Sequence, residues 1–170
     1  EHFVPVTDAS ALQRIDPASR DAIRQVDLEP LGITDLGEFP TAFSTPPAIP
    51  ELFFNGARMS LARWPNGDEW ATIAQVVDSG PAPWRNHTST DTGTFEYSGD
   101  RPARWVNAPG VWLYGYWCFD WASETIRIQS IDPAQHRITL ATPHVYGIGS
   151  GNPAERRFCA LNLLEELDTP

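Results

Sequence analysis

Short apolar segments separated by turn residues run through the chain from residue 51 onward, and this pattern limits the fold more than any other feature. The clearest case is Asn55 and Gly56, which lie between the apolar segments 52–54 and 58–64. Asn-Gly between two strands is typical of a tight β-hairpin, because both turn residues need a positive φ. Sixteen prolines and twelve glycines supply turns elsewhere. The pattern predicts a mostly β fold, a small antiparallel β-barrel or sandwich with one or two short helices.

Further strands are expected where apolar residues alternate or cluster, at 71–77, 94–97, 111–121, 125–131 and 137–140. The last two strands are expected to form an antiparallel hairpin. Segment 111–121 is the most aromatic, and alternation gives it two faces: Trp112, Tyr114, Tyr116, Cys118 and Asp120 on one, and Leu113, Trp117, Phe119 and Trp121 on the other. Because both faces are largely apolar, we expect a central strand that is buried on two sides.

The two ends of the chain have weaker patterns. Residues 9–25 predict a short helix, with Asp16 as its N-cap and Pro17 at its first position, and 25–33 predicts a short strand. Residues 38–50 are rich in proline and are expected to form an extended surface connector. Residues 157–168 predict a strand followed by a short helix. The 37 residues before the connector are too few for a core of their own, so we expect a single domain over 1–170.

The charge balance excludes some classes of partner. Twenty-two acidic residues against twelve basic ones give a formal net charge of −10, and all twelve bases are arginine. Nucleic acids and anionic membrane surfaces are recognised by basic faces, so we expect neither as a partner. No apolar run reaches the roughly 18–20 residues that a membrane helix needs. The two cysteines, Cys118 and Cys159, leave open whether they form a bridge.

Motifs for metal, phosphate or nucleophilic chemistry are absent from the sequence. The four histidines show neither HxH nor HxxxH spacing, and there is no CxxC pair, so we expect no metal site. The glycine-rich segment 147–153 contains no lysine and matches neither a P-loop nor a dinucleotide fingerprint, so we expect no cofactor. There is no GxSxG motif, and Cys118 stands among aromatics, where a structural role is expected.

Carboxylates beside aromatic residues are the remaining candidates for catalysis, because glycoside cleavage needs a pair of them. These candidates are Asp68, Glu69, Glu96, Asp120 and Glu124. Asp120 stands between Phe119 and Trp121, and burial against their rings would raise its pKa, as a general acid requires. The alternative, which we favour, is that Asp120 ends the strand and accepts hydrogen bonds from backbone amides of the turn at Ala122 and Ser123.

Seven tryptophans in one small domain point toward sugar binding, because sugar rings stack on indoles. Four of them stand near expected turns, where a platform would be exposed: Trp64, Trp70, Trp84 and Trp105. The alternative is that they plug the ends of a small barrel. Arg63 has two interpretations as well, a clamp on the carboxylate of an acidic sugar, or a structural arginine stacked on Trp64 or paired with an acid.

Three stretches resemble right-handed parallel β-helix proteins, many of which are carbohydrate-active. They are ELFFNGARM with LARWPN (51–59 and 61–66), GYWCFDWA (115–122) and RFCALNLLEELD (157–168). In that family, the last element leads into the β-helix itself. The resemblance implies that this chain is the small β-barrel module near the start of such a protein, similar to the barrel of α-1,3-galactosidase-like enzymes. The chain ends where the coils should begin, so we expect a piece of a larger protein.

The resemblance also implies a function and a place of action. We expect a non-catalytic accessory module that shapes one side of the glycan cleft or braces the β-helix of a glycoside hydrolase or polysaccharide lyase. The expected partners are that β-helix and a poly- or oligosaccharide, and the expected location is secreted, cell-surface or periplasmic. The candidate sugar-binding residues are Arg63, Trp64, Trp117, Asp120 and Trp121. A stand-alone carbohydrate-binding module is the alternative, and a self-contained glycosidase is a third class.

Overall fold

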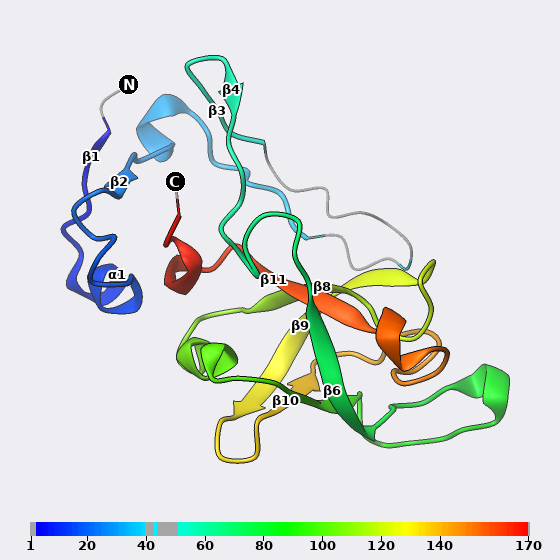
Figure 1. Cartoon of the computed structure of the whole chain (residues 1–170). Coiled ribbons are helices and arrows are strands. Elements are labelled where there is room, and N and C mark those ends of the chain that lie inside the picture. Colours follow the sequence, from blue (N-terminus) through cyan, green and yellow to red (C-terminus); the bar gives the residue numbers. More distant parts are fainter. Residues whose placement is uncertain (1–2, 40–42, 44–50, 170) are drawn as a thin grey trace.

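Six strands close into an antiparallel barrel in the computed structural model, which describes residues 3–39, 43 and 51–169 (Figure 1). Around the barrel the strands follow the order β11, β6, β7, β10, β9 and β8, and β8 pairs with β11 to close it. Their bounds are Ala71–Asp78 (β6), Thr94–Tyr97 (β7), Trp112–Tyr116 (β8), Ser123–Asp132 (β9), Arg137–Leu140 (β10) and Arg157–Leu161 (β11). The predicted fold class, a small antiparallel barrel, is confirmed.

One side of β11 has two partners in succession. Its first residues pair with β6, and its last two pair with the short strand β5 (Arg63–Trp64). The turn between β5 and β6 therefore lies beside the same strand that closes the barrel. This arrangement positions Trp64 and Trp70 around one region of the surface, described below.

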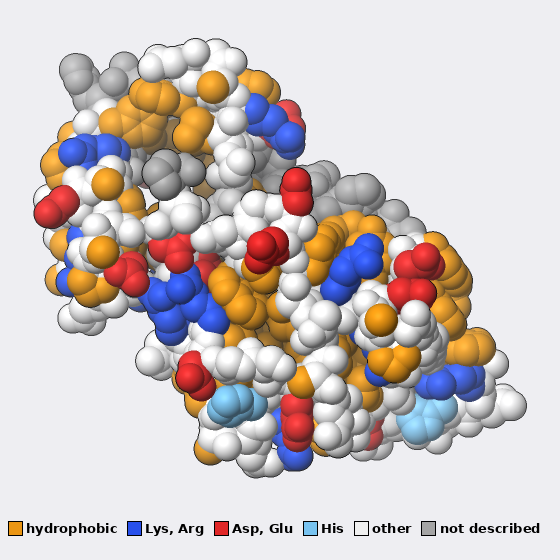
Figure 2. All heavy atoms as spheres, in the orientation of Figure 1, with side chains coloured by type: hydrophobic (Ala, Val, Ile, Leu, Met, Phe, Trp, Pro, Cys, Tyr) orange, Lys and Arg blue, Asp and Glu red, His pale blue; other side chains and the backbone are white. Residues whose placement is uncertain are grey.

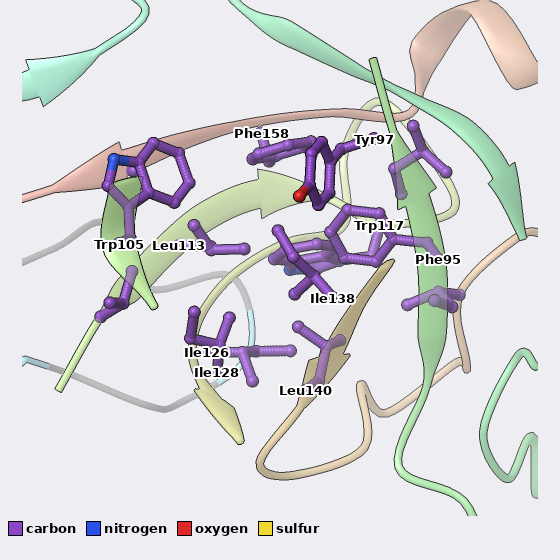
Figure 3. Close-up of a cluster of buried hydrophobic side chains, with 14 of the residues drawn as sticks. Phe95, Tyr97, Trp105, Leu113, Trp117, Ile126, Ile128, Ile138, Leu140 and Phe158 are labelled. Carbon is purple, nitrogen blue, oxygen red and sulfur yellow. The ribbon is translucent and has the colours of Figure 1, made fainter. Parts of the chain in front are cut away.

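The core is a single cluster of aromatic and branched aliphatic side chains inside the barrel (Figure 3). Phe95, Trp117 and Phe158 are fully buried and lie against one another, with ring centroids 5.3 to 6.4 Å apart. Gly115 permits this packing, because a Cβ there would lie 2.9 Å from the carbonyl oxygen of Arg157 on the paired strand. The barrel is thus filled by side chains rather than hollow.

Short elements surround the barrel. They are β1 (Val4–Pro5), α1 (Ala9–Arg14), β2 (Arg24–Gln25), the hairpin β3 (Phe53–Phe54) with β4 (Ala57–Arg58), and 3-10 turns at Glu29–Leu31, Pro83–Arg85, Arg101–Trp105, Pro153–Glu155 and Leu164–Glu166. In Figure 1, α1 and the β3–β4 hairpin lie outside the barrel. Asn55 and Gly56 have φ of 50° and 77°, which confirms the predicted hairpin turn. The second arm predicted over 58–64 ends at Arg58, and Arg63–Trp64 form β5, which pairs with β11 instead.

Several other elements are also confirmed by the structure. They are the strands at 71–77 and 94–97, the hairpin formed by 125–131 and 137–140, and the strand and short helical turn within 157–168. Most of the predicted connector, 40–42 and 44–50, lies outside the described residues. Both cysteines are free and buried, so the bridge that the sequence left open is not formed.

The predicted N-terminal helix is misplaced. The helix α1 ends before Asp16, and its N-cap is Asp8, whose carboxylate accepts a hydrogen bond from the amide of Ala11 at 2.7 Å. Asp16 instead caps a turn, accepting from the amide of Ala18 at 3.0 Å. In the segment predicted as a strand at 25–33, only Gln25 belongs to a strand, β2, and Glu29–Leu31 form a 3-10 turn, because Pro30 interrupts any ladder of hydrogen bonds there.

The predicted strand 111–121 is too long, since β8 ends at Tyr116. The chain then turns, with the amide of Ala122 donating to the carbonyl of Phe119 at 3.1 Å. Within β8 only one face is buried, that of Leu113 and Gly115, whereas Trp112 and Tyr114 are half-exposed. The expectation of a strand buried on both faces was therefore wrong, and it placed Phe119 and Trp121 in a strand when they belong to a turn.

Candidate functional site

Four aromatic side chains meet at one end of the barrel, and we call them the aromatic platform: Trp84, Phe119, Trp121 and Tyr146. The ring of Phe43 lies against two of them, with centroids 6.1 Å from Trp121 and 5.3 Å from Tyr146. The rings of Phe119 and Trp121 are parallel, with an interplanar angle of 1° and centroids 5.5 Å apart. Trp121 is 58% exposed and Trp84 is 51% exposed. Figure 2 shows hydrophobic side chains on the surface at the right-hand end of the molecule, where the loop after β8 lies in Figure 1.

Loops far apart in the sequence hold the platform in place. The indole nitrogen of Trp84 donates to the carbonyl of Tyr146 at 3.0 Å, which joins the loop after β6 to the loop after β10. The amide of Gly149 donates to the carbonyl of Trp117 at 3.1 Å, which fixes the start of the turn that carries Phe119 and Trp121. The guanidinium of Arg85 lies 5.2 Å from the ring centre of Trp84. These contacts keep the ring positions ordered before any ligand arrives.

Two buried titratable groups, Glu124 and His144, lie next to this turn. Burial raises the pKa of Glu124 to about 7 and lowers the pKa of His144 to about 4. His144 accepts at Nδ1 from the amide of Tyr146 and faces the carbonyl of Ala122 with Nε2, an arrangement that suits the neutral ring. Its Nδ1 is 3.8 Å from Glu124 Oε2, which has no hydrogen-bond partner among the described residues. Because His144 is neutral at pH 7, this contact is not an ion pair at that pH.

The structure separates the five predicted sugar-binding residues into three places. Asp120 and Trp121 lie on the turn at the platform. Trp117 is fully buried, and its indole nitrogen donates to the carbonyl of Glu124 at 2.9 Å, so it is a core residue that offers no surface to a sugar. Arg63 and Trp64 lie on β5, at a different pocket.

Neither sequence interpretation of Asp120 matches its surroundings. Its side chain is exposed, so it is not buried against Phe119 and Trp121 as the interpretation as a general acid required. The amide of Ala122 bonds to the carbonyl of Phe119 instead. Asp120 thus presents an accessible carboxylate beside the platform, which can accept hydrogen bonds from ligand hydroxyls.

The place at β5 is a pocket of about 230 Å³, which we call the Trp64–Trp70 pocket. It is lined by Trp64, Pro65, Trp70, Ala71, Thr72, Tyr97, Ser98 and Phe158. Arg63 is a structural residue here: its Nη1 donates to the carbonyl of Gly67, and its Nη2 donates to that of Glu69 at 2.7 Å. Its guanidinium lies 5.5 Å from the ring centre of Trp70, not on Trp64. The arginine therefore holds the turn that forms one side of the pocket.

Sequence reasoning missed part of both places. It named Trp84 and Trp70 only as tryptophans near turns, and it did not single out Tyr146 or His144, which lie in the loop after β10. Trp105, grouped with the exposed candidates, is 1% exposed. A tryptophan near a turn can point either way, and the sequence does not distinguish the two orientations.

Metal and thiol chemistry find no support in the described part of the chain. Within residues 3–39, 43 and 51–169 no group of three or more His, Cys, Asp or Glu side chains could hold a metal ion. Burial raises the pKa of the Cys118 thiol to about 11 and also raises that of Cys159, so both thiols are protonated at neutral pH. Over the same residues no helix is long and apolar enough to span a membrane.

No protein-family model, no curated protein and no solved structure matches this chain.

Proposed function

We propose that this chain is a non-catalytic accessory β-barrel that contacts glycan through its aromatic platform, within a larger carbohydrate-active protein. The observation that carries the proposal is the parallel pair Phe119 and Trp121, with Trp121 58% exposed. Sugar rings present C–H groups on their faces, and these groups stack on exposed aromatic rings. Exposed large aromatic groups that gather in one patch mark an interaction site rather than a random surface.

Polar groups beside the rings suit a hydroxylated ligand. The exposed carboxylate of Asp120 accepts hydrogen bonds, and the guanidinium of Arg85 beside Trp84 donates them. A sugar needs both an apolar face and hydrogen-bonding partners at its edges, and the platform offers both. From the resemblance to β-helix proteins, we propose that the parent β-helix supplies the rest of the cleft and that the protein acts outside the cell or at its surface.

Oligosaccharide binding tests the proposal. The chain is titrated with an array of poly- and oligosaccharides, beside Trp121→Ala and a control, Trp112→Ala, which removes a half-exposed tryptophan elsewhere on the barrel. We expect Trp121→Ala to weaken binding at least ten-fold, about 1.4 kcal/mol, and Trp112→Ala to leave it unchanged. Equal binding by wild type and Trp121→Ala would remove the platform as the site.

The same screen separates the alternatives. Equal binding by the 170-residue chain and by a longer form that continues into the expected β-helix supports a stand-alone carbohydrate-binding module. Markedly tighter binding by the longer form supports the accessory role. Hydrolysis by the 170-residue chain would overturn the non-catalytic assignment and direct mutagenesis to Asp120 and Glu124.

A further inference from the structure

We propose that the Trp64–Trp70 pocket is a second binding site, separate from the platform, that takes one neutral sugar ring such as the terminal unit of a glycan. The inference rests on the proposed glycan-contacting function. It adds a site for a single neutral sugar ring, away from the platform on which the proposed function depends. The pocket and the platform are lined by different residues.

The two indoles of the pocket are held in position by other side chains. Trp64 meets Trp105 edge-on, with centroids 5.4 Å apart and an interplanar angle of 68°. Trp70 lies 5.6 Å from the ring of Tyr116, and the guanidinium of Arg157 is 5.2 Å from its ring centre. Both indoles are half-buried, so each keeps part of its surface open. Little side-chain freedom remains to be lost when a ligand binds.

A hydroxyl group among the lining residues lacks a partner. Tyr97 is 3% exposed, and its hydroxyl has no hydrogen-bond partner among the described residues. Tyr97 and Phe158 both line the pocket. A buried hydroxyl without a partner destabilises the folded protein. The Tyr97 hydroxyl has almost no accessible surface, so a ligand hydroxyl would bond to it, and relieve that cost, through a small shift of the pocket wall. Thr72 and Ser98 add two more hydroxyl groups to the lining.

Size and charge narrow the ligand to one class. The volume of about 230 Å³ lies below the roughly 300–1,000 Å³ of sites for drug-sized molecules, so the pocket suits a single ring. No carboxylate lines it, which disfavours a cation. Both terminal nitrogens of Arg63 are already bonded to backbone carbonyls, which disfavours a carboxylate or phosphate held by that residue. A ring with apolar faces and hydroxyl edges fits these conditions.

The test uses methyl glycosides, which are too small to span an extended platform. The 170-residue chain is titrated with the methyl glycosides of glucose, galactose, mannose, xylose and glucuronic acid, and binding is followed by saturation-transfer NMR and tryptophan fluorescence. Three variants are compared with wild type: Tyr97→Phe, Trp70→Ala and Trp121→Ala. Trp112→Ala is the control, because it removes a half-exposed tryptophan that lines neither the pocket nor the platform.

We expect at least one neutral glycoside to bind. Trp70→Ala should weaken it ten-fold or more, and Tyr97→Phe should weaken it about five-fold through the loss of one hydrogen bond. Tyr97→Phe should leave the midpoint of urea unfolding unchanged or higher, since it removes a hydroxyl without a partner. This variant keeps the test valid even where Trp70→Ala fails to fold. Trp112→Ala should bind methyl glycosides as wild type does, and Trp121→Ala should retain the binding at the pocket.

Three outcomes would overturn the inference. Weakening by Trp121→Ala but by neither pocket variant would place the sugar on the platform, which removes the pocket and keeps the proposed function. Tighter binding of the glucuronide than of every neutral glycoside would show that the ligand is not a neutral sugar. Binding of no methyl glycoside would remove the pocket, whereas the proposed function would still be judged by the effect of Trp121→Ala on oligosaccharides.

Discussion

Trp117 and Trp121 stand four residues apart, yet they are expected to respond to mutation in opposite ways. Trp117 is fully buried against Phe95 and Phe158, so Trp117→Ala leaves a large cavity and should cost about 3–5 kcal/mol of unfolding free energy. Trp121 is 58% exposed, so Trp121→Ala should cost less than about 1 kcal/mol. Urea unfolding of the two variants measures the difference. Similar losses would show that the turn and the core are coupled more closely than their burial indicates.

Glu124 should make stability depend on pH. Burial raises its pKa from an ordinary value of 4.5 to about 7, so the folded chain binds this proton more tightly than the unfolded chain does. Its contribution to stability is therefore largest at low pH and is lost as the pH rises from about 4.5 through about 7. Glu124→Gln removes this titration. Between pH 5 and pH 8, we expect the variant to gain about 2 kcal/mol relative to wild type.

The measurement for Glu124 is urea unfolding of both proteins at several pH values. The buried His144, whose pKa is lowered to about 4, destabilises the fold as the pH falls from about 6.5. That effect is present in both proteins and largely cancels in the difference between them. Glu69→Gln, which changes an exposed carboxylate, is the matched control. A difference between Glu124→Gln and wild type that stays constant with pH would contradict the raised pKa.

At the scale of elements, local turn signals account for what the sequence could predict. Asn55 and Gly56 specify their hairpin by backbone conformation alone, and the hairpin of β9 and β10 has clean alternation on both strands. The turn after β8 contains neither glycine nor proline between Trp117 and Ala122. It is fixed instead by a hydrogen bond from Gly149, about thirty residues away. Alternation of residues along the sequence therefore could not show where β8 ends.

Gly151 should be the most sensitive position in the loop beneath the platform. It has a φ of 72°, and a Cβ there would clash with the carbonyl oxygen of Cys118 and lie 2.9 Å from the ring of Phe119. We expect Gly151→Ala to cost about 3 kcal/mol of unfolding free energy and to weaken the proposed oligosaccharide binding, because Phe119 must move. Gly67→Ala is the control: its φ of 62° is similar, but nothing lies within 4 Å of the added Cβ, so about 1 kcal/mol is expected.

Equal losses of unfolding free energy in the two glycine variants would show that backbone strain alone decides the cost. If Gly151→Ala lowers stability but leaves oligosaccharide binding unchanged, the Phe119 ring does not contribute to the binding site. The pair therefore tests the packing of the loop and the role of the ring in one comparison.

At the scale of the whole molecule, the fold class was predictable and the arrangement of the site was not. Alternation and turn residues are enough to specify short antiparallel strands, and closing them into a barrel removes all but short edges. The candidate residues were chosen because they were aromatic and near turns. Which of them faces the core depends on strand closure and loop contacts, as the contrast between Trp105 and Trp84 shows. That information is in the tertiary structure and is absent from any single segment.

The N-terminal segment is fastened to the barrel by an ion pair between the two ends of the chain. Arg14 at the end of α1 donates from Nε and Nη2 to Glu165 at 2.6 and 3.1 Å, and Glu165 is only 4% exposed. Removing one partner of such a pair leaves a buried charge without compensation, at a cost of about 3–5 kcal/mol. Among the described residues of this N-terminal segment, 3–25, Ile15 is the buried hydrophobic side chain.

Arg14→Met keeps the apolar stem of the side chain and removes the charge. We expect amides in 3–25 to exchange with solvent markedly faster, because this segment then opens without unfolding the barrel. Amides in β7 and β10 should exchange as in wild type, as followed by hydrogen-exchange mass spectrometry. Arg58→Met is the control, since it breaks an exposed pair with Glu51 and should change little. Faster exchange in the barrel strands of Arg14→Met would show instead that the two ends of the chain and the barrel unfold as one cooperative unit.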